Sequence, residues 1–429
     1  MSELALTGIL TVVIVGLWAT GKLPEYYVAL LFFCVAMLTK IAPAPVVFSG
    51  FASSAFWLIL SGFILAAALR KSGLADWLAY RFLPVMSGSW LRMVAGVVVL
   101  SWLLAFLMPS NMARITLLMP VVMALADQAG VASDARGRIG LALAVGLGTF
   151  ELSASILPAN VPNMIMIGAM ESGYGAHITY LPYLLLHAPV IGVMKGIVLT
   201  FIIYKLFPTR MEKKTFDATY PPLTAVQKRL GAILLVTVML WVSEGVHGIA
   251  PAWVGLGAAC LCLLPRAGFL TSEEFAAGVN VRSCIYVAGI IGLTAVVTIN
   301  GLGDWMGNQL IHIMPDTRDS PFLAYLSNTF IAGALSFAVT ANGVPALFTP
   351  LAQSLSEITS LPLMTVLMTQ VIGYSTPFIP YQAPPLVIAM AIGRVPLREG
   401  IRVCTILALV TYLFLVPMNY VWFAITGWI

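Results

Sequence analysis

The chain has 429 residues, of which 60% are hydrophobic and only 9% are charged, and its formal net charge is +5. An ordinary soluble domain carries about 25% charged residues, so this composition excludes a soluble globular protein and predicts an all-α polytopic membrane protein. The basic residues lie in short loops between apolar segments, and we therefore expect the lipid bilayer, and no nucleic acid, as a partner.

The first 207 residues form a series of apolar segments that are long enough for several helices. Uninterrupted spans are predicted at about 4–20, 26–38, 55–69 and 184–207. The N-terminus lacks the basic region and the cleavage site of a signal peptide, so we expect the first span to be retained. The length of the whole chain allows about ten to twelve helices.

Two apolar segments of this first half are interrupted. The segment at about 93–126 contains Pro109-Ser110-Asn111, and the segment at about 139–169 contains a polar, proline-containing stretch from Thr149 to Asn163. Interrupted backbone at membrane depth is tolerated only where it faces a cavity or other protein. We therefore predict a re-entrant hairpin at 93–126 and a broken helix at 139–169.

The most polar stretch of the chain, 208–229, is predicted to be a cytoplasmic linker, after which the pattern begins again. The half 230–429 contains a predicted re-entrant hairpin at about 322–356 and a predicted broken helix at about 363–392. The residues 73–77 (GLADW) return as 301–305 (GLGDW). Ordered matches of this kind predict an internal duplication, with 1–207 and 230–429 as the two repeats.

The number of crossings predicts how the two repeats are oriented. Each half has about five full crossings plus one hairpin that returns to its own side, so the second half would be inverted relative to the first. With both termini outside, most of the 22 Lys and Arg residues fall on the cytoplasmic side, as the positive-inside rule requires. We expect an integral protein of a bacterial inner (plasma) membrane with both termini periplasmic or extracellular.

Inverted halves that each contain broken segments are typical of carriers that bind their solute near the membrane midplane. A helix that begins at depth offers free N–H groups to an anion, and a helix that ends there offers carbonyl groups to a cation. The alternative is that the polar side chains only cap helix ends. The candidate substrate-binding and ion-binding residues at the breaks are Ser110, Asn111, Met112, Arg114, Thr149, Glu151, Asn160, Pro162, Asn163, Thr340, Ala341, Asn342, Gly343, Thr376, Pro377, Gln382 and Pro384.

Three ionisable residues lie within apolar segments. An ionisable residue at membrane depth is a functional-site hypothesis by default. Arg114 could contact an anionic substrate or stand in for a bound cation, with Glu151 as its partner or as a proton site; a structural ion pair is the alternative. Lys195 lies in the span 184–207, and we expect it to extend its amine to the membrane surface.

The motifs at the breaks resemble those of a known family. Ser110-Asn111-Met112-Ala113, followed by Pro120, is similar to the Ser-Asn-Thr hairpin tip of the divalent-anion/sodium symporter family, a member of the ion transporter superfamily. Asn160-Val161-Pro162-Asn163 resembles the Thr-Pro-Pro-Asn loop of that family, and Gln382-Ala383-Pro384-Pro385 resembles its repeat. The chain departs from the family at Met112, which replaces a Thr, and at the second tip, where Thr340-Ala341-Asn342 lacks the central Asn.

The resemblance implies a scaffold domain that forms a homodimer and a transport domain that holds both hairpins and moves like an elevator. It implies sodium ions as the coupling ions, bound near Ser110, Asn111, Thr340 and Asn342, and no other cofactor. The function implied is secondary active transport of a small anion such as a dicarboxylate, a tricarboxylate or sulfate.

Other functions are open to a chain of this kind. A proton-coupled or exchange carrier, of the type of the related arsenite and sodium/proton permeases, would share the broken-helix layout. A channel or a membrane enzyme is a further alternative. The four His residues are scattered without metal-ligand spacing, and no nucleotide-binding motif is present in the sequence. We therefore expect a protein that is not an enzyme and has no catalytic residues.

Overall fold

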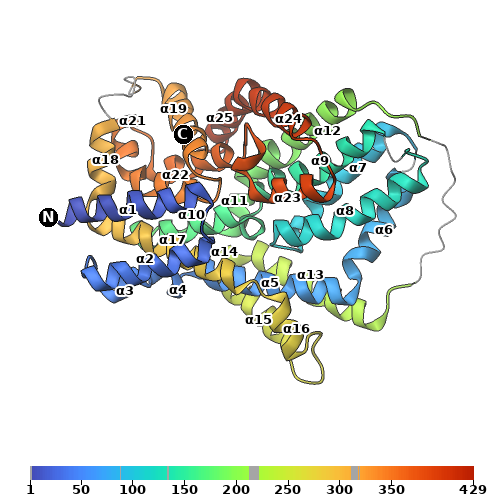
Figure 1. Ribbon diagram of the computed structural model, residues 1–429, viewed down its shortest axis with the longest axis horizontal. Coiled ribbons are helices and arrows are strands. Elements are labelled where there is room, and N and C mark those ends of the chain that lie inside the picture. Colours follow the sequence, from blue (N-terminus) through green and yellow to red (C-terminus); the bar gives the residue numbers. More distant parts are fainter. Residues whose placement is uncertain (1, 87, 133–134, 212–221, 311–316, 318) are drawn as a thin grey trace.

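The computed structural model describes residues 2–86, 88–132, 135–211, 222–310, 317 and 319–429. Within these residues every regular element is a helix (Figure 1). Seven of the described helices are long and apolar enough to cross a membrane, and three shorter apolar helices have 10–17 residues. The prediction of an all-α polytopic membrane protein is confirmed.

The chain begins with helices that are defined by clear caps. Ser2 caps the first helix, and Gly21, with a φ of 60°, ends it. The helix that ends at Ser72 is followed by Gly73 with a φ of 68°, a left-handed conformation that glycine adopts without steric cost. These helices are α1 (Glu3–Thr20), α2 (Glu25–Thr39), α3 (Ala44–Val47), α4 (Ser49–Ala52), α5 (Ser54–Ser72) and α6 (Leu74–Met86).

The first interrupted segment is a helical hairpin. Its arms are α7 (Trp90–Leu103), extended by the 3₁₀ turn η1 (Leu104–Phe106), and α8 (Asn111–Gln128). Pro109 has no N–H to continue a helix, and the Ser110 hydroxyl accepts a hydrogen bond from Ala113 N at 3.3 Å to start the next one. The tip of this hairpin is therefore residues 107–110.

The second interrupted segment is a broken helix that is buried within the protein. It consists of α9 (Arg136–Phe150), the 3₁₀ turns η2 (Leu152–Ser155) and η3 (Leu157–Ala159), and α10 (Val161–Tyr174). Every residue from 140 to 160 is buried, and burial against other parts of the protein is one of the two settings in which irregular backbone is tolerated at membrane depth. The first half ends with α11 (Tyr180–His187), the π-helical turn η4 (Ala188–Met194) and α12 (Lys195–Leu206).

The second half follows the same order of elements after the linker, of which residues 212–221 lie outside the described residues. The second hairpin has its tip at 339–343, and a second π-helical turn, η7, lies in the last long helix as η4 does in α11–α12. The helices are α13 (Ala225–Val242), α14 (Glu244–His247), α15 (Pro251–Leu263), α16 (Ser272–Gly278), α17 (Val281–Ile299), α18 (Leu302–Leu310), α19 (Pro321–Ala338), α20 (Val344–Phe348), η5 (Thr349–Leu351), α21 (Ala352–Thr359), α22 (Leu363–Tyr374), η6 (Pro380–Gln382), α23 (Pro384–Ile392), α24 (Leu397–Val410), η7 (Thr411–Leu415) and α25 (Val416–Ile425).

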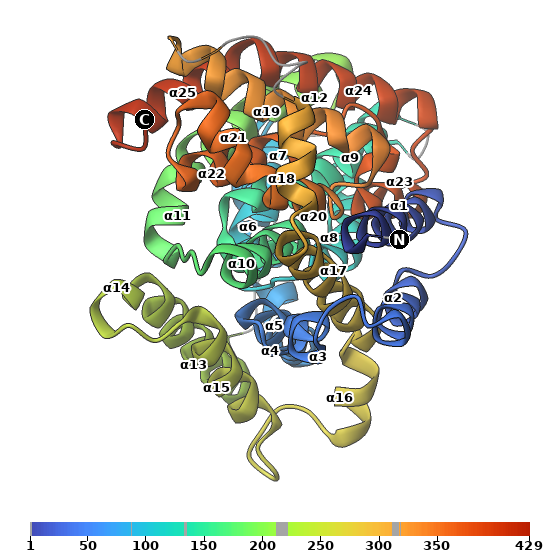
Figure 2. The same ribbon diagram turned by 90° about the vertical axis from the view of Figure 1, so that its left-hand side faces the viewer.

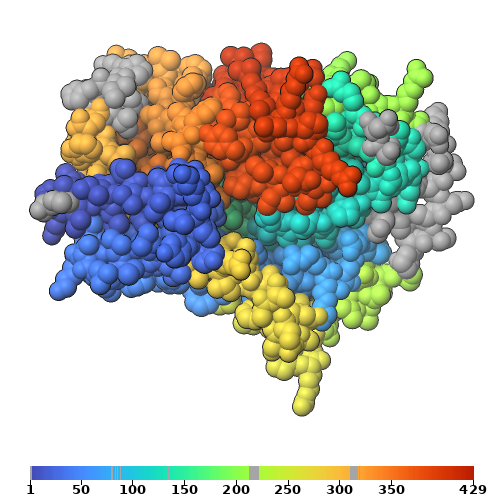
Figure 3. All heavy atoms as spheres, viewed as in Figure 1, coloured from blue at the N-terminus to red at the C-terminus, as the bar shows by residue number. Residues whose placement is uncertain are grey.

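The interrupted helices of the two halves pack against one another. Helix α23 contacts α8 and α9, and α10 contacts α17, α20 and α22. Figure 2 shows α13, α15 and α16 at one side of the molecule, away from α22–α25. In the space-filling view the residues near 270 project from this side (Figure 3). The breaks of both halves therefore meet inside the structure; the inversion of the halves in the membrane stays a prediction.

Candidate functional site

A cavity of ≈ 230 Å³ lies where the two hairpin tips and the two helix breaks meet. Predicted site residues from both halves line it, although the two sets lie 182 positions apart in the sequence, from Asn160 to Asn342. Those residues are Ser110, Asn111 and Met112 of the first tip, Asn160 of the first break, Asn342 of the second tip and Pro384 of the second break.

The rest of the lining comes from helices that the sequence pattern does not single out. Gly62 and Phe63 of α5 and Tyr286 of α17 line the cavity, and so does Glu25, the first residue of α2 and the one acidic residue of the described lining. These helices are uninterrupted and apolar, so nothing in their pattern marks them as part of a site. The one available signal is Asn280, which also lines the cavity and caps α17 by accepting a hydrogen bond from Ser283 N at 3.2 Å.

Three helices begin at the cavity. Asn111 is the first residue of α8, Val161 is the first residue of α10 and Pro384 is the first residue of α23, and all three line the cavity. No side chain caps the N-termini of α10 and α23. Helix N-termini carry a partial positive charge, and α8 and α10 also have free N–H groups in their first turns. Helix α23 begins with Pro384 and Pro385, which have no N–H, so it contributes only its dipole. The arrangement of the three helix dipoles favours an anion.

The first tip is fixed to the first break by side-chain amides. Asn111 Nδ2 donates to Asn160 Oδ1 at 3.0 Å, and Asn160 Nδ2 donates to the carbonyl of Phe150 at 3.3 Å. The Ser153 hydroxyl donates to Asn111 Oδ1 at 3.1 Å. Both amides are buried, so the polar wall of the cavity is held in a defined geometry.

The second tip is fixed to the second break in a similar way, but through the backbone. Ala341 N donates to the carbonyl of Gln382 at 2.8 Å. The Gln382 side chain accepts hydrogen bonds from Phe378 N and Ile379 N and donates to Ser336 Oγ at 2.6 Å. Gln382 therefore shapes the break instead of lining the cavity.

Other predicted site residues lie outside the cavity lining. Thr340 and Gly343 border a separate space of only ≈ 10 Å³ beside Tyr286. The Asn163 amide donates to three carbonyl groups of residues 154–157, and its Oδ1 accepts from the Tyr374 hydroxyl at 2.7 Å. For Asn163 the structure shows the capping role, and Pro162 and Pro377 contribute backbone shape at their breaks.

Arg114 is fully buried and does not line the cavity. Its guanidinium donates to the carbonyl of Met108, to Asn111 Oδ1, and to the carbonyls of Thr149 (3.1 Å) and Ala159 (3.2 Å). It lies directly behind Asn111 in the cavity wall. No carboxylate of the described residues pairs with it, so the hypothesis of an Arg114–Glu151 pair is wrong.

Glu151 is paired with Lys195 instead. Glu151 Oε2 lies 2.6 Å from Lys195 Nζ, and both side chains are at most 1% exposed. The same ammonium group donates to the carbonyl of Ser375 at 2.9 Å and to the Thr376 hydroxyl at 2.8 Å. The prediction that Lys195 extends to the membrane surface is therefore wrong, because three oxygen partners are available to it inside the protein.

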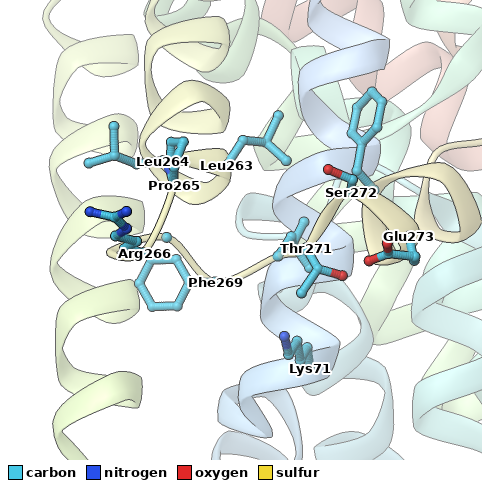
Figure 4. Close-up of a pocket in the computed structure, with 12 residues that line it drawn as sticks. Lys71, Leu263, Leu264, Pro265, Arg266, Phe269, Thr271, Ser272 and Glu273 are labelled. Atoms are coloured by element: carbon cyan, nitrogen blue, oxygen red, sulfur yellow. The ribbon is translucent and has the colours of Figure 1, made fainter.

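A larger surface pocket, of ≈ 620 Å³, lies on the loop between α15 and α16 (Figure 4). It is lined by Lys71, Arg266 and Glu273 among others, and it contains none of the predicted site residues. Among the described residues no group of three His, Cys, Asp or Glu side chains could hold a metal ion. The cavity between the breaks is thus the candidate site.

Comparison with known proteins gives a consistent result. Residues 1–429 match the model of a family described as the sodium:sulfate symporter transmembrane region. An L-tartrate/succinate antiporter of Escherichia coli K12 is 23% identical over 394 residues, which cover 87% of this chain and 79% of that protein. A membrane protein of Cupriavidus necator is 22% identical over 395 residues, which cover 89% of this chain and 77% of that protein.

A solved structure supports the fold. The crystal structure of the Alcanivorax borkumensis YdaH transporter, described as having an unusual topology, matches with a TM-score of 0.55 and 12% identity. The match covers 89% of this chain and 88% of that one.

Proposed function

This chain belongs to the sodium:sulfate symporter family, and from that premise we propose that it carries a small divalent organic anion across the membrane by alternating access. It is a secondary transporter and not an enzyme. The relatives named L-tartrate/succinate antiporter support a four-carbon dicarboxylate as the substrate class.

The observation that carries this proposal is the cavity between the breaks. Its volume of ≈ 230 Å³ is below the range of about 300–1,000 Å³ that is usual for drug-sized ligands, so it suits a small solute. The N-termini of α8 and α10 and the side-chain amides of Asn111, Asn160 and Asn342 provide hydrogen-bond donors for an anion, and α23 adds the positive end of its dipole. Arg114 adds a positive charge directly behind this wall.

The division of the lining supports an elevator-type movement. The tips and the breaks supply one side of the cavity, and the uninterrupted helices α5 and α17 supply the other. We propose that the hairpins and broken helices form the transport domain, which retains the anion while it moves along a scaffold that includes α5 and α17. We also propose that the scaffold forms a homodimer in a bacterial inner membrane, with both termini outside.

Sodium coupling, which the family resemblance implies, stays a prediction. Exchange of one anion for another is the second candidate. It is supported by the antiporter relatives and by the contacts of Arg114 and Lys195 with the ends of the broken helices.

Counterflow in proteoliposomes tests the proposed function. Vesicles that contain the purified protein are loaded with unlabelled succinate and are then given trace labelled succinate, tartrate, citrate or sulfate. We expect saturable accumulation of a dicarboxylate, and the same rate for the Arg136→Ala variant, because Arg136 is an exposed partner of Glu399 far from the cavity lining. If the folded protein accumulates none of the four anions, or passes them without saturation as a channel would, the proposed function is wrong.

A further inference from the structure

Two helices of this protein have their C-termini in its interior, where their last backbone carbonyl groups are buried. Helix α9 ends at Phe150 and helix α22 ends at Tyr374. The last carbonyl groups of a helix have no partner within the helix and carry a partial negative charge. In carriers with broken helices such ends coordinate the coupling cation, so the groups that face them here decide whether sodium fits.

At the end of α9 four oxygen atoms converge on one side chain. They are the carbonyl oxygens of Met108, Thr149 and Ala159 and the amide oxygen of Asn111, and all four accept hydrogen bonds from the Arg114 guanidinium. They come from the first hairpin tip and from both sides of the first break. This is an oxygen cluster that suits a hard cation, and the guanidinium already fills it.

At the end of α22 a different side chain does the same. The Lys195 ammonium group donates hydrogen bonds to the carbonyl oxygen of Ser375 and to the Thr376 hydroxyl, and it forms an ion pair with the Glu151 carboxylate. It comes from α12, outside the second hairpin. In the register that aligns Ser110 with Thr340, the position of Arg114 is taken by Val344, so the second half has no arginine of its own and receives a lysine from the first.

The residues present therefore do not fit bound sodium at either helix end. The oxygen atoms are engaged by N–H donors at both ends. At the end of α9 an added cation would also lie beside the unpaired charge of Arg114 with little solvent to screen it. At the end of α22 the Lys195 ammonium group already neutralises the one carboxylate that the described residues place there, Glu151. We propose that Arg114 and Lys195 are built-in cations that replace both coupling sodium ions, so that this carrier exchanges anions without sodium. This inference rests on the proposed function, and it identifies the gradient of a counter-moving anion as the energy source of transport.

Arg114 and Lys195 are covalently part of the protein, and this determines which gradient can drive transport. A symporter gains energy because its sodium ions leave on the side where sodium is dilute, but Arg114 and Lys195 cannot leave. A sodium gradient then has no step on which to act, and the gradient of a counter-moving anion remains. Among the described residues Arg114 has no acidic partner, so the empty site keeps a positive charge that favours binding of a second anion before the return movement.

Cation replacement in the counterflow assay tests the inference. Wild-type protein is compared in sodium, potassium and choline media of equal ionic strength, with unlabelled succinate inside. We expect equal rates in the three media and no accumulation in vesicles without internal anion. Accumulation that requires sodium overturns the inference while leaving the proposed function intact. Absence of accumulation of any of the four anions in any medium overturns the proposed function itself.

Substitution of Arg114 gives a second, independent test. Arg114→Ala leaves the four oxygen atoms without a donor, so sodium should enter the vacated cluster. We expect its rate in choline to fall about tenfold or more, equivalent to ~1.4 kcal/mol or more, and to recover in part with sodium. Arg114→Lys keeps a cation and should stay indifferent to sodium.

A purely structural role of Arg114 predicts a different pattern. It would lower activity in all media alike, and sodium would not raise the thermal stability of the purified Arg114→Ala protein. That result overturns the assignment, and Arg136→Ala serves as the matched arginine control. If Arg114→Ala does not fold, the wild-type comparison of the three media decides alone.

Discussion

Glu151 Oε2 lies 2.6 Å from Lys195 Nζ, and the same ammonium group reaches Thr376 Oγ1 at 2.8 Å. This contact joins the end of the first broken helix to the end of the second through a residue of α12. The two half-sites are therefore linked by a buried ion pair and not only by apolar packing.

The buried pair leads to a prediction about stability. Glu151→Gln or Lys195→Met alone leaves one buried charge without its partner, which typically costs about 3–5 kcal/mol. The double variant should be more stable than either single variant, because both charges are then gone. Thermal unfolding of the purified proteins measures this order.

The exposed pair of Lys71 and Glu274, whose side chains are 44% and 38% exposed, provides the matched control. Removal of either partner there should leave the unfolding temperature nearly unchanged, because exposed ion pairs contribute little. If the double variant of Glu151 and Lys195 is the least stable of the buried series, the ion-pair interpretation is wrong.

A second prediction concerns the charge of the cavity wall. Asn111→Asp places a carboxylate where the anion binds, and the repulsion between like charges should raise KM for a dicarboxylate by about tenfold or more. The fold should survive, because Arg114 already donates to this side chain. Asn308→Asp on the exposed face of α18 adds the same charge elsewhere. An unchanged KM for Asn111→Asp in counterflow kinetics would place the substrate outside this cavity.

A third prediction concerns the contact between α5 and the first tip. A Cβ atom added to Gly62 would lie 2.7 Å from Pro109 Cγ, too close for ordinary packing, so Gly62→Ala must displace the tip. Since misplacement by about 1 Å can cost a factor of about 100, we expect transport to slow by about tenfold. Gly16→Ala is the control, because nothing lies within 4 Å of its added Cβ atom. Equal rates for the two variants would show that the tip position does not matter.

A fourth prediction concerns pH and Glu274 of α16, whose partner Lys71 lines the surface pocket of Figure 4. The hydrogen bond from Lys71 holds the pKa of the Glu274 carboxyl below its ordinary value of 4.5, with help from Thr271 N. The ionised form is thus favoured in the folded protein. The small contribution of this contact to stability should be present above pH 4.5 and should disappear as the pH falls through the lowered pKa.

This pH effect can be measured by comparing unfolding temperatures across acidic pH. The difference between wild type and Glu274→Gln should shrink toward zero at the acidic end. A difference that grows as the pH falls would have the opposite sign and would contradict a lowered pKa of Glu274.

The positions at which helices are interrupted could be predicted from the sequence. Pro109 has no N–H to donate and Ser110 is a strong N-cap, so the break between η1 and α8 could be predicted, and α8 begins at Asn111. The cavity residues of α17 could not be predicted, because Tyr286 lies in an uninterrupted apolar helix. Only packing against the breaks makes it part of the wall.

The partner of Glu151 could not be predicted for a different reason. Lys195 follows the π-helical turn Ala188–Met194, and a π turn adds a residue that rotates the following helix by about 100°. A regular α-helical reading of this span assigns Lys195 the wrong face. The charge that was expected to reach the surface is therefore directed at the helix ends.

The most direct measurement is equilibrium binding of a labelled dicarboxylate to the purified protein in a sodium-free choline buffer. The account predicts saturable binding whose Kd does not change when sodium replaces choline at constant ionic strength, and which weakens in Asn111→Asp. Binding that begins only when sodium is added would contradict the claim that Arg114 and Lys195 supply the cations of this site.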